Sequence, residues 1–183
     1  MFVGRKKELD ALNSRYKSNR KEFGVLYGRR RIGKSSILNE FFKGKKGILF
    51  QAKQDNSYGN LKSFSYEVDH LLNLPDTFVF ASWQHAFKSI QEYAKNERFV
   101  LIIDEYPYIV SQDSSFSSVL QEFIDHTSDN MMVILSGSDI GFLQKEIQNH
   151  ASPLYKRRTF EMEIKKMNFM DAKEFVKMED VES

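Results

Sequence analysis

The sequence predicts an α/β domain, built as a three-layer sandwich in which a five-stranded, mainly parallel sheet lies between two layers of helices. Two observations favour this class. Short and almost continuous apolar segments alternate along the chain with stretches whose apolar residues recur at helical spacing. Strands that are apolar on both faces are typical of parallel sheets that helices cover on each side. The 183 residues are also enough for one such domain with a substantial core.

Five segments are expected to form strands, and seven are expected to form helices. The expected strands are 23–27, 47–52, 99–103, 131–135 and 160–164. The last strand is the most marginal, because apolar and acidic residues alternate in it. The apolar stripes of the expected helices fall within 9–16, 37–42, 61–72, 83–93, 116–124, 140–147 and 169–176. We expect residues 1–165 to form the core domain and residues 166–183 to begin a lid or C-terminal region that is otherwise truncated or absent.

Composition and charge narrow the classes of function. With 41% hydrophobic and 28% charged residues, the chain has the composition of a soluble globular protein, and a net charge of +2 does not by itself indicate nucleic-acid binding. The chain contains no cysteine, which excludes disulfides and thiolate metal sites. No apolar stretch is as long as a membrane span, and the first residues lack an apolar signal region. We therefore expect a cytoplasmic protein with no membrane partner.

The clearest motif runs from Gly28 to Ser35. It matches the phosphate-binding pattern G-x-x-x-x-G-K-S and lies between an expected strand and an expected helix. Glycines let the backbone N–H groups of such a loop turn toward phosphates, and the helix N-terminus adds partial positive charge. Lys34 can reach the β- and γ-phosphates of a nucleotide, and the Ser35 hydroxyl can ligate Mg²⁺. The residues expected to bind nucleotide here are Gly28, Arg29, Arg30, Arg31, Ile32, Gly33, Lys34, Ser35 and Ser36.

Two basic clusters can be interpreted in two ways. Arg29, Arg30 and Arg31 either form a solvated basic turn or add positive charge beside a polyanionic ligand, and only one or two of them could face the phosphates. Arg157 and Arg158, in the loop before the last expected strand, either are solvated or stabilise charge on the transferred phosphoryl group. An arginine of this second pair could act within its own chain or across a subunit interface.

Two acidic residues, Asp104 and Glu105, directly follow the expected strand 99–103. In phosphate-loop ATPases the first acid lies beside the Mg²⁺ ligand of the loop, and the second can act as a general base toward the attacking water. Adjacent carboxylates at the end of a buried strand are unfavourable unless metal or water satisfies them. Ser138, after the next strand, either touches the γ-phosphate or the water, or belongs to a common turn. The expected metal ligands are Ser35 and Asp104.

In their order along the chain, these motifs resemble the archaeal-type ATPase family, a P-loop NTPase family in the STAND branch close to AAA+ proteins. The motifs that carry the resemblance are at 2–9, 28–35, 104–108, 137–138 and 153–159. The phosphate loop and the acid pair occur in many ATPases, whereas the first and last motifs narrow the match. The resemblance implies that the backbone of Val3, Gly4 and Arg5 contacts adenine and that Ser138 occupies the sensor position. Lys156 stands where relatives usually have glycine, and Asp139 stands where they often have serine.

The resemblance implies a domain that binds ATP or ADP with Mg²⁺, hydrolyses ATP slowly and uses the nucleotide state as a conformational switch. The residues expected in catalysis are Lys34, Glu105, Ser138, Arg157 and Arg158. Relatives continue into a helical lid, a winged-helix domain and often a nuclease-like part, so nucleic acid is expected as a partner only through such further domains. Two alternatives stay open, namely a regulatory or assembly module that binds nucleotide with negligible hydrolysis and, less favoured, a small-molecule kinase. A GTPase is disfavoured because the sequence has no Asn-Lys-x-Asp signature.

Overall fold

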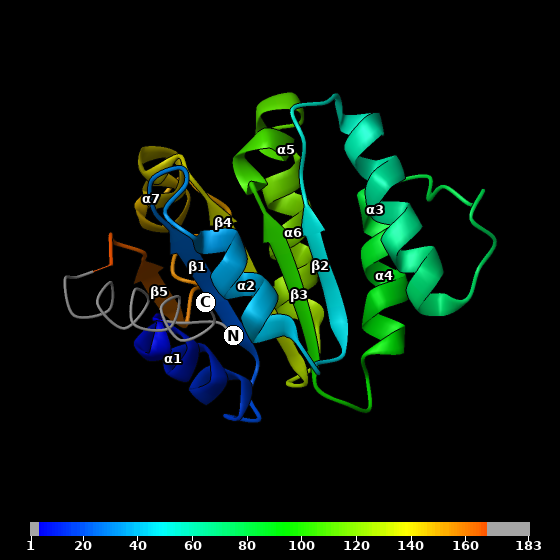
Figure 1. The fold of residues 1–183 in the computed structure, drawn as a ribbon. Coiled ribbons are helices and arrows are strands. Elements are labelled where there is room, and N and C mark those ends of the chain that lie inside the picture. Colours follow the sequence, from blue (N-terminus) through cyan, green and yellow to red (C-terminus); the bar gives the residue numbers. More distant parts are fainter. Residues whose placement is uncertain (1–3, 168–183) are drawn as a thin grey trace, which may run out of the picture.

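The computed structural model describes residues 4–167, which form a five-stranded sheet between two layers of helices (Figure 1). The strands lie in the order β2-β3-β4-β1-β5, and every neighbouring pair is parallel. Their bounds are β1 Glu22–Tyr27, β2 Gly47–Gln51, β3 Phe99–Asp104, β4 Met131–Gly137 and β5 Phe160–Glu163. The predicted three-layer α/β class and the parallel five-stranded sheet are therefore confirmed.

Seven helices are found in the described part of the chain. They are α1 Lys6–Tyr16, α2 Lys34–Phe42, α3 Ser57–Leu72, α4 Trp83–Tyr93, α5 Tyr106–Gln112, α6 Phe116–His126 and α7 Ile140–Gln148. The helix α5 is not expected from the sequence, because it is short and contains Pro107 in its first turn, where proline is tolerated. The expected helix within 169–176 lies outside the described residues. No helix between residues 4 and 167 has both the length and the apolar character needed to cross a membrane.

Successive strand residues point to opposite faces of the sheet and supply two separate hydrophobic clusters. One cluster packs α1 and α2 against one face, through residues such as Leu12, Ile37 and Ile102. The other cluster packs α3 to α7 against the second face and includes Leu101 of β3. Because both faces of the sheet are buried, the central strands are apolar at almost every position, which explains the continuous apolar segments of the sequence.

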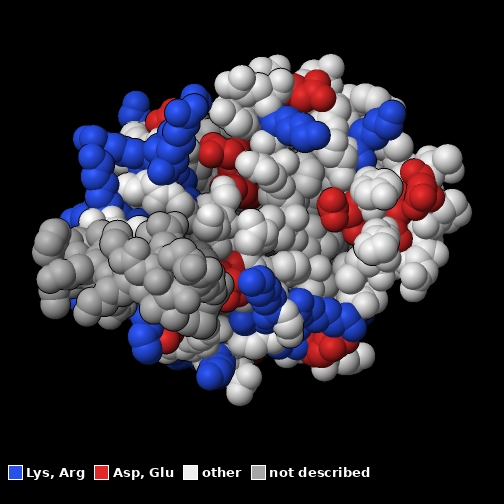
Figure 2. Space-filling view, viewed as in Figure 1, with Lys and Arg blue, Asp and Glu red and all other residues white. Residues whose placement is uncertain are grey.

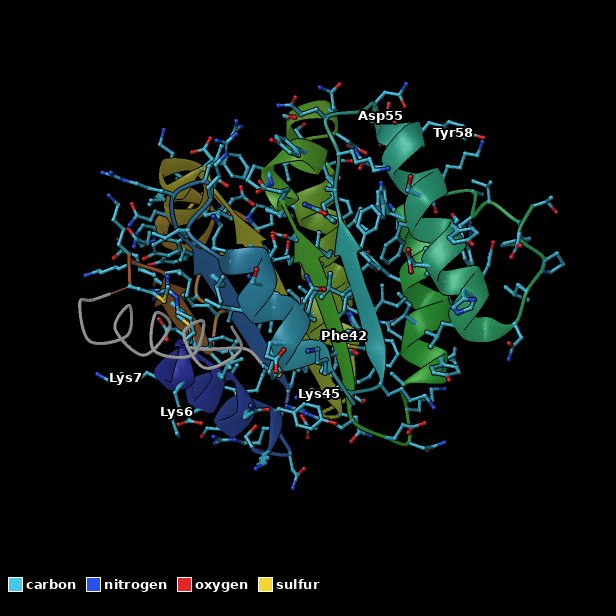
Figure 3. The ribbon with its side chains drawn as sticks, in the orientation of Figure 1. Lys6, Lys7, Phe42, Lys45, Asp55 and Tyr58 are labelled. Atoms are coloured by element: carbon cyan, nitrogen blue, oxygen red, sulfur yellow. The ribbon has the colours of Figure 1, made fainter. Side chains whose placement is uncertain are left out.

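The strand register brings several chain segments together at the carboxyl edge of the sheet. Tyr27 lies opposite Gly137, and Gln51 lies opposite Asp104, so β1, β4, β2 and β3 end at about the same level. The loop after β1, the acids at and after the end of β3, and the serines at and after the end of β4 therefore meet at one edge. Asp55 and Tyr58 mark this end of the molecule in Figure 3, whereas Phe42 and Lys45 mark the opposite end, where α2 finishes.

Candidate nucleotide-binding site

The phosphate loop joins β1 to α2 at the carboxyl edge of the sheet. Gly33 is the N-cap of α2 and has φ 97°, a left-handed conformation that favours glycine. A Cβ on Gly33 would meet no atom within 4 Å, so the backbone conformation rather than a lack of space requires glycine here. No side chain caps α2, and its first backbone hydrogen bond runs from Ile37 N to Gly33 O. The N–H groups of the first turn are therefore available to an anionic ligand.

Lys34 is held by the backbone of its own loop. Its side chain is buried, and Nζ donates hydrogen bonds to Gly28 O at 2.7 Å and to Arg29 O at 2.8 Å. Burial lowers the pKa of the Lys34 ammonium below its ordinary value, and attraction to the carboxylates of Glu105 and Asp104 acts in the opposite direction. An ammonium group carries a further N–H donor beyond these two, and that donor can meet a phosphate oxygen.

Asp104 is a buried carboxylate that three donors orient. The Ser35 hydroxyl donates to Oδ2 at 2.7 Å, the Ser136 hydroxyl donates to Oδ1 at 2.6 Å, and the backbone N–H of Glu105 also donates to Oδ1, at 2.9 Å. The two residues expected to ligate Mg²⁺ are therefore in direct contact. The contact of Ser136 is not expected from the sequence. The sequence does carry a signal for it, because Ser136 is a single polar residue in an otherwise apolar strand. Ser136 directly follows Leu135, and Leu135 pairs with Ile103, the residue before Asp104.

Glu105 is the N-cap of α5 and has a left-handed backbone conformation, with φ 55° and ψ 39°. Such a conformation costs a non-glycine residue about 1–2 kcal/mol and is often found at functional sites. The Ser138 hydroxyl donates to Glu105 Oε1 at 3.0 Å, so the end of β4 holds the carboxylate that follows β3. The structure thus brings Glu105 and Ser138 together, as the sequence analysis expects if both act at one site.

A cavity of about 560 Å³ opens between the phosphate loop and α5. Eight of the expected site residues line it, namely Arg30, Arg31, Gly33, Lys34, Ser35, Ser36, Glu105 and Ser138. Three further lining residues, Gln51, Ala52 and Tyr108, are missed by the sequence analysis, although all three lie just beyond or at the carboxyl ends of β2 and β3. Lys and Arg side chains gather over this end of the molecule, at the upper left of Figure 2. The cavity thus combines a basic loop with an acidic residue.

The remaining loop residues line a second hollow on the other side of the phosphate loop. Gly28, Arg29 and Ile32 contact this space of about 320 Å³, together with Ile164 and other residues after β5. A Cβ on Gly28 would lie 2.5 Å from Ile164 O, so only glycine fits beneath that strand end. The three arginines of the loop are therefore divided between two sides, with Arg30 and Arg31 on the side of Glu105.

The N-terminal motif also contacts the phosphate loop. Arg5 donates from Nη2 to Ile32 O at 3.0 Å and pairs through Nη1 with Glu8 at 3.1 Å. Only 9% of its side chain is exposed, so this contact ties the start of α1 to the loop. Gly4 has φ 76° and Arg5 has φ 66°, whereas Val3 lies outside the described residues. The expected contact of this segment with adenine stays a prediction.

Arg157 and Arg158 lie away from the cavity within the single chain. Arg157 forms a two-point ion pair with Asp125, with nitrogen–oxygen distances of 2.8 and 3.0 Å. Asp125 is near the end of α6, where Lys21 donates to its backbone oxygen and to that of Ile124, so this pair lies at the amino edge of the sheet. Arg158 pairs with Glu161 of β5 at 3.0 Å. The expected catalytic role of either arginine stays a prediction.

Known proteins match the chain in both sequence and fold. The model of a family described as an ATPase domain predominantly from Archaea matches residues 2–182. An uncharacterized protein of Methanocaldococcus jannaschii is 30% identical over 177 residues, which cover 96% of this chain and 38% of that protein. An uncharacterized ATP-binding protein of the same organism is 44% identical over 46 residues, which cover 25% of this chain and 78% of that protein.

Solved structures share the fold at low sequence identity. The ORC1 protein of Aeropyrum pernix, solved in complex with DNA, has a TM-score of 0.72 and 13% identity, covering 100% of this chain and 50% of that chain. The ADP form of the ORC2 protein of Aeropyrum pernix has a TM-score of 0.63 and 17% identity, covering 90% of this chain and 48% of that chain. The chain thus spans about two fifths of the longer curated relative and about half of each solved chain. Because the family model covers nearly the whole sequence, this chain belongs to the family of ATPase domains found predominantly in Archaea, and it shares its fold with the two ORC proteins.

Proposed function

We propose that this chain is the nucleotide-binding core of a STAND-type or AAA+-like ATPase, which hydrolyses ATP with Mg²⁺ and uses the nucleotide state as a conformational switch. The observation that carries the proposal is the joint placement of loop and acids. Lys34, Ser35 and Glu105 line one cavity, and Asp104 directly contacts Ser35. ATP or ADP is the ligand we expect there, in a protein that we expect in the cytoplasm.

Phosphate binding follows from the loop geometry. The N–H groups of the first turn of α2 have no partner within the helix, and the helix dipole favours an anion at this end. Lys34 keeps its ammonium group beside these donors through Gly28 O and Arg29 O. A triphosphate bound on the loop would therefore meet backbone donors and a positioned cation at once.

The donor set at Ser35 and Asp104 fits Mg²⁺. A hydroxyl oxygen and a carboxylate oxygen are hard ligands of the type that Mg²⁺ prefers, and these two lie 2.7 Å apart. Ser136 and the Glu105 backbone hold the other carboxylate oxygen, so the ligand is already oriented. When bound, Mg²⁺ would neutralise charge on the β- and γ-phosphates.

Glu105 is the residue we propose as general base. Its carboxylate lines the cavity, and Ser138 donates to Oε1, whereas Oε2 accepts no hydrogen bond from the part of the chain that the structure describes and can accept a proton from a water molecule. That water would attack the terminal phosphate, giving ADP and inorganic phosphate. The left-handed backbone at Glu105 aims the side chain to the cavity while the preceding Asp104 stays buried.

A second candidate is a nucleotide-binding module with negligible turnover. It is favoured by the placement of Arg157, which pairs with Asp125 at the amino edge of the sheet and so supplies no charge to the phosphates of its own chain. An arginine from a neighbouring copy could act at the cavity instead, which would make self-association part of the mechanism. Contacts with nucleic acid would come from regions beyond this chain.

Phosphate release separates the two candidates. We expect wild type to release phosphate from ATP and Glu105→Gln to lose this activity by at least about 100-fold, because a general base contributes about that much. The affinity of Glu105→Gln for ATP, titrated on the same preparation, should stay close to that of wild type. Glu122→Gln, on the exposed face of α6, is the matched control and should release phosphate normally. Intact binding without any wild-type release would instead identify the module, and acceptor-dependent consumption of ATP would identify a kinase.

A further inference from the structure

Arg30 and Tyr108 face each other across the nucleotide cavity. Arg30 lies on the phosphate loop, and Tyr108 lies in the first turn of α5, three residues after Glu105. The Arg30 Nη2 donates a hydrogen bond to the Tyr108 hydroxyl at 3.2 Å, and both side chains line the cavity. This contact joins the phosphate-binding wall of the cavity to the wall that carries the proposed base.

The partner of Arg30 orients its guanidinium without neutralising it. A phenol is uncharged at neutral pH, so the cation keeps its full charge and its remaining N–H donors for a ligand. Arg157 and Arg158 differ in this respect, because each pairs with a carboxylate, Asp125 and Glu161 respectively. Arg30 is therefore an oriented cation at the cavity that pairs with no carboxylate among residues 4–167.

The position of Arg30 points to the terminal phosphate. Arg29 lines the separate hollow on the other side of the loop, whereas Arg30 shares its cavity with Glu105 and Ser138. If Glu105 activates the water that attacks the γ-phosphate, the phosphate at this end of the cavity is the terminal one. A guanidinium here could bind two of its oxygens, whereas Lys34 already uses two of its three N–H donors on Gly28 O and Arg29 O.

We propose that Arg30 binds the terminal phosphate of ATP within its own chain and that Tyr108 is the positioning residue that holds Arg30 across the cavity. This inference rests on the proposed function, since it needs a triphosphate on the loop. It gives the site a preference for ATP over ADP, because ADP has no phosphate at that end. It also assigns a role to Tyr108 of the Tyr106-Pro107-Tyr108 segment after the acids, which α5 brings to the cavity beside the loop.

Calorimetric titrations with ATP and with ADP, each with Mg²⁺, test the proposal without any need for turnover. Arg30→Ala should weaken ATP binding by about tenfold and ADP binding much less, as expected for the loss of a charge-assisted hydrogen bond. Tyr108→Phe should lower the ATP affinity in the same direction by about threefold, since it removes the neutral hydrogen bond but not the ring. The double variant should bind ATP no more weakly than Arg30→Ala, because Tyr108 acts only through Arg30.

Matched controls and the possible outcomes keep the test decisive. Arg20→Ala and Tyr66→Phe change exposed residues of the same types away from the cavity, and neither should change the ratio of ATP to ADP affinity. If Tyr108→Phe instead lowered the affinities for ATP and ADP equally, its effect would be a general loss of structure, and the positioning role of Tyr108 would be contradicted. An unchanged ratio in Arg30→Ala, with ATP still bound and Lys34→Ala defective, would overturn this inference alone. Failure of wild type to bind either nucleotide would overturn the proposed function itself.

Discussion

The hydroxyl of Ser35 lies 2.7 Å from the carboxylate of Asp104, although 69 positions separate the two residues in the sequence. This contact joins the phosphate loop, between β1 and α2, to the end of β3. Asp104 is only 1% exposed, and its other oxygen accepts hydrogen bonds from Ser136 and from the Glu105 backbone. Contacts within the protein therefore orient the proposed metal ligands, which is the preorganisation that an efficient site requires.

The effect of Mg²⁺ on ATP affinity should depend on Asp104. Asp104→Asn keeps the shape of the side chain but removes its charge, so we expect the gain in ATP affinity from Mg²⁺ to fall by about tenfold or more. With EDTA in place of Mg²⁺, the variant and wild type should bind ATP about equally. Asp129→Asn, an exposed change in the loop before β4, is the control. An unchanged Mg²⁺ effect in Asp104→Asn would exclude this carboxylate as a ligand.

Ser136 should stabilise the fold through its hydrogen bond to Asp104. The serine is fully buried, and Ser136→Ala leaves one carboxylate oxygen short of a donor. We expect the free energy of unfolding in urea to fall by about 1–2 kcal/mol, because a buried hydrogen bond to a charged group is lost and Oδ1 keeps only the Glu105 N–H. Ser118→Ala, on the exposed face of α6, should change it by less than about 0.5 kcal/mol. Equal effects of the two substitutions would show that the Ser136 bond contributes no net stability.

Asp69 should make the fold less stable as pH rises. This carboxylate of α3 is buried, and neither oxygen has a hydrogen-bond partner among the described residues. Burial, followed by the charge of Asp76, raises the pKa of Asp69 above its ordinary 3.8. The folded state therefore binds this proton more tightly than the unfolded state does, and stability is lost as pH rises from 3.8 through the raised pKa.

Replacing the Asp69 carboxylate with an uncharged amide should stabilise the fold. Asp69→Asn should raise the free energy of unfolding by about 1 kcal/mol at neutral pH, because it removes a buried and unpaired charge. The gain should disappear in acid, where Asp69 of wild type is protonated. Asp76→Asn should give a smaller gain, since Asp76 is the lesser cause of the shift. Urea titrations from acid to neutral pH give the free energy of unfolding of wild type, Asp69→Asn and Asp76→Asn. A lower free energy of unfolding for Asp69→Asn at neutral pH would contradict the view that the charge of Asp69 destabilises the fold.

Arg157 should affect stability more than nucleotide binding in the single chain. Its ion pair with Asp125 lowers the pKa of that carboxyl below its ordinary value, chiefly through the hydrogen bond from the guanidinium. A lowered folded-state pKa means that the stabilisation is present at neutral pH and is lost as pH falls through that pKa. Arg157→Ala should therefore cost about 0.5–1 kcal/mol at neutral pH, as for other partly exposed pairs, and less in acid. If Arg157→Ala lost most of its ATP hydrolysis while its stability changed only by this small amount, the result would instead support an action of Arg157 on a neighbouring copy.

The sequence predicts the fold well because its signals are local. Each central strand is an apolar run bounded by polar residues, and each confirmed helix has an apolar stripe, so the alternation alone predicts a parallel sheet with two helical layers. The short helix α5 is missed because Pro107 and seven residues give too little periodicity. Its presence matters, since it carries Tyr108 back over the cavity.

The site is predicted only in part, because part of it depends on contacts between distant segments. The phosphate loop and the acid pair are visible in the sequence since their residues are consecutive. The hydrogen bond from Ser136 to Asp104 and that from Arg5 to Ile32 depend on strand order and helix packing, which spacing does not reveal. Arg157 is the opposite case. The sequence analysis expects this arginine in catalysis, but in the structure it pairs with Asp125 at the amino edge of the sheet.

The measurement that tests the central claim most directly is a calorimetric titration of wild type, Lys34→Ala and Lys43→Ala with ATP and Mg²⁺. Lys34 lies at the first turn of α2 against the cavity, whereas Lys43 follows the last turn of the same helix and pairs with Glu40. We predict that Lys34→Ala loses at least about 100-fold in ATP affinity, because it removes the positive charge of Lys34 and its charge-assisted hydrogen bond to phosphate, and that Lys43→Ala binds like wild type. Equal binding of ATP by wild type and Lys34→Ala would contradict a nucleotide site on this loop.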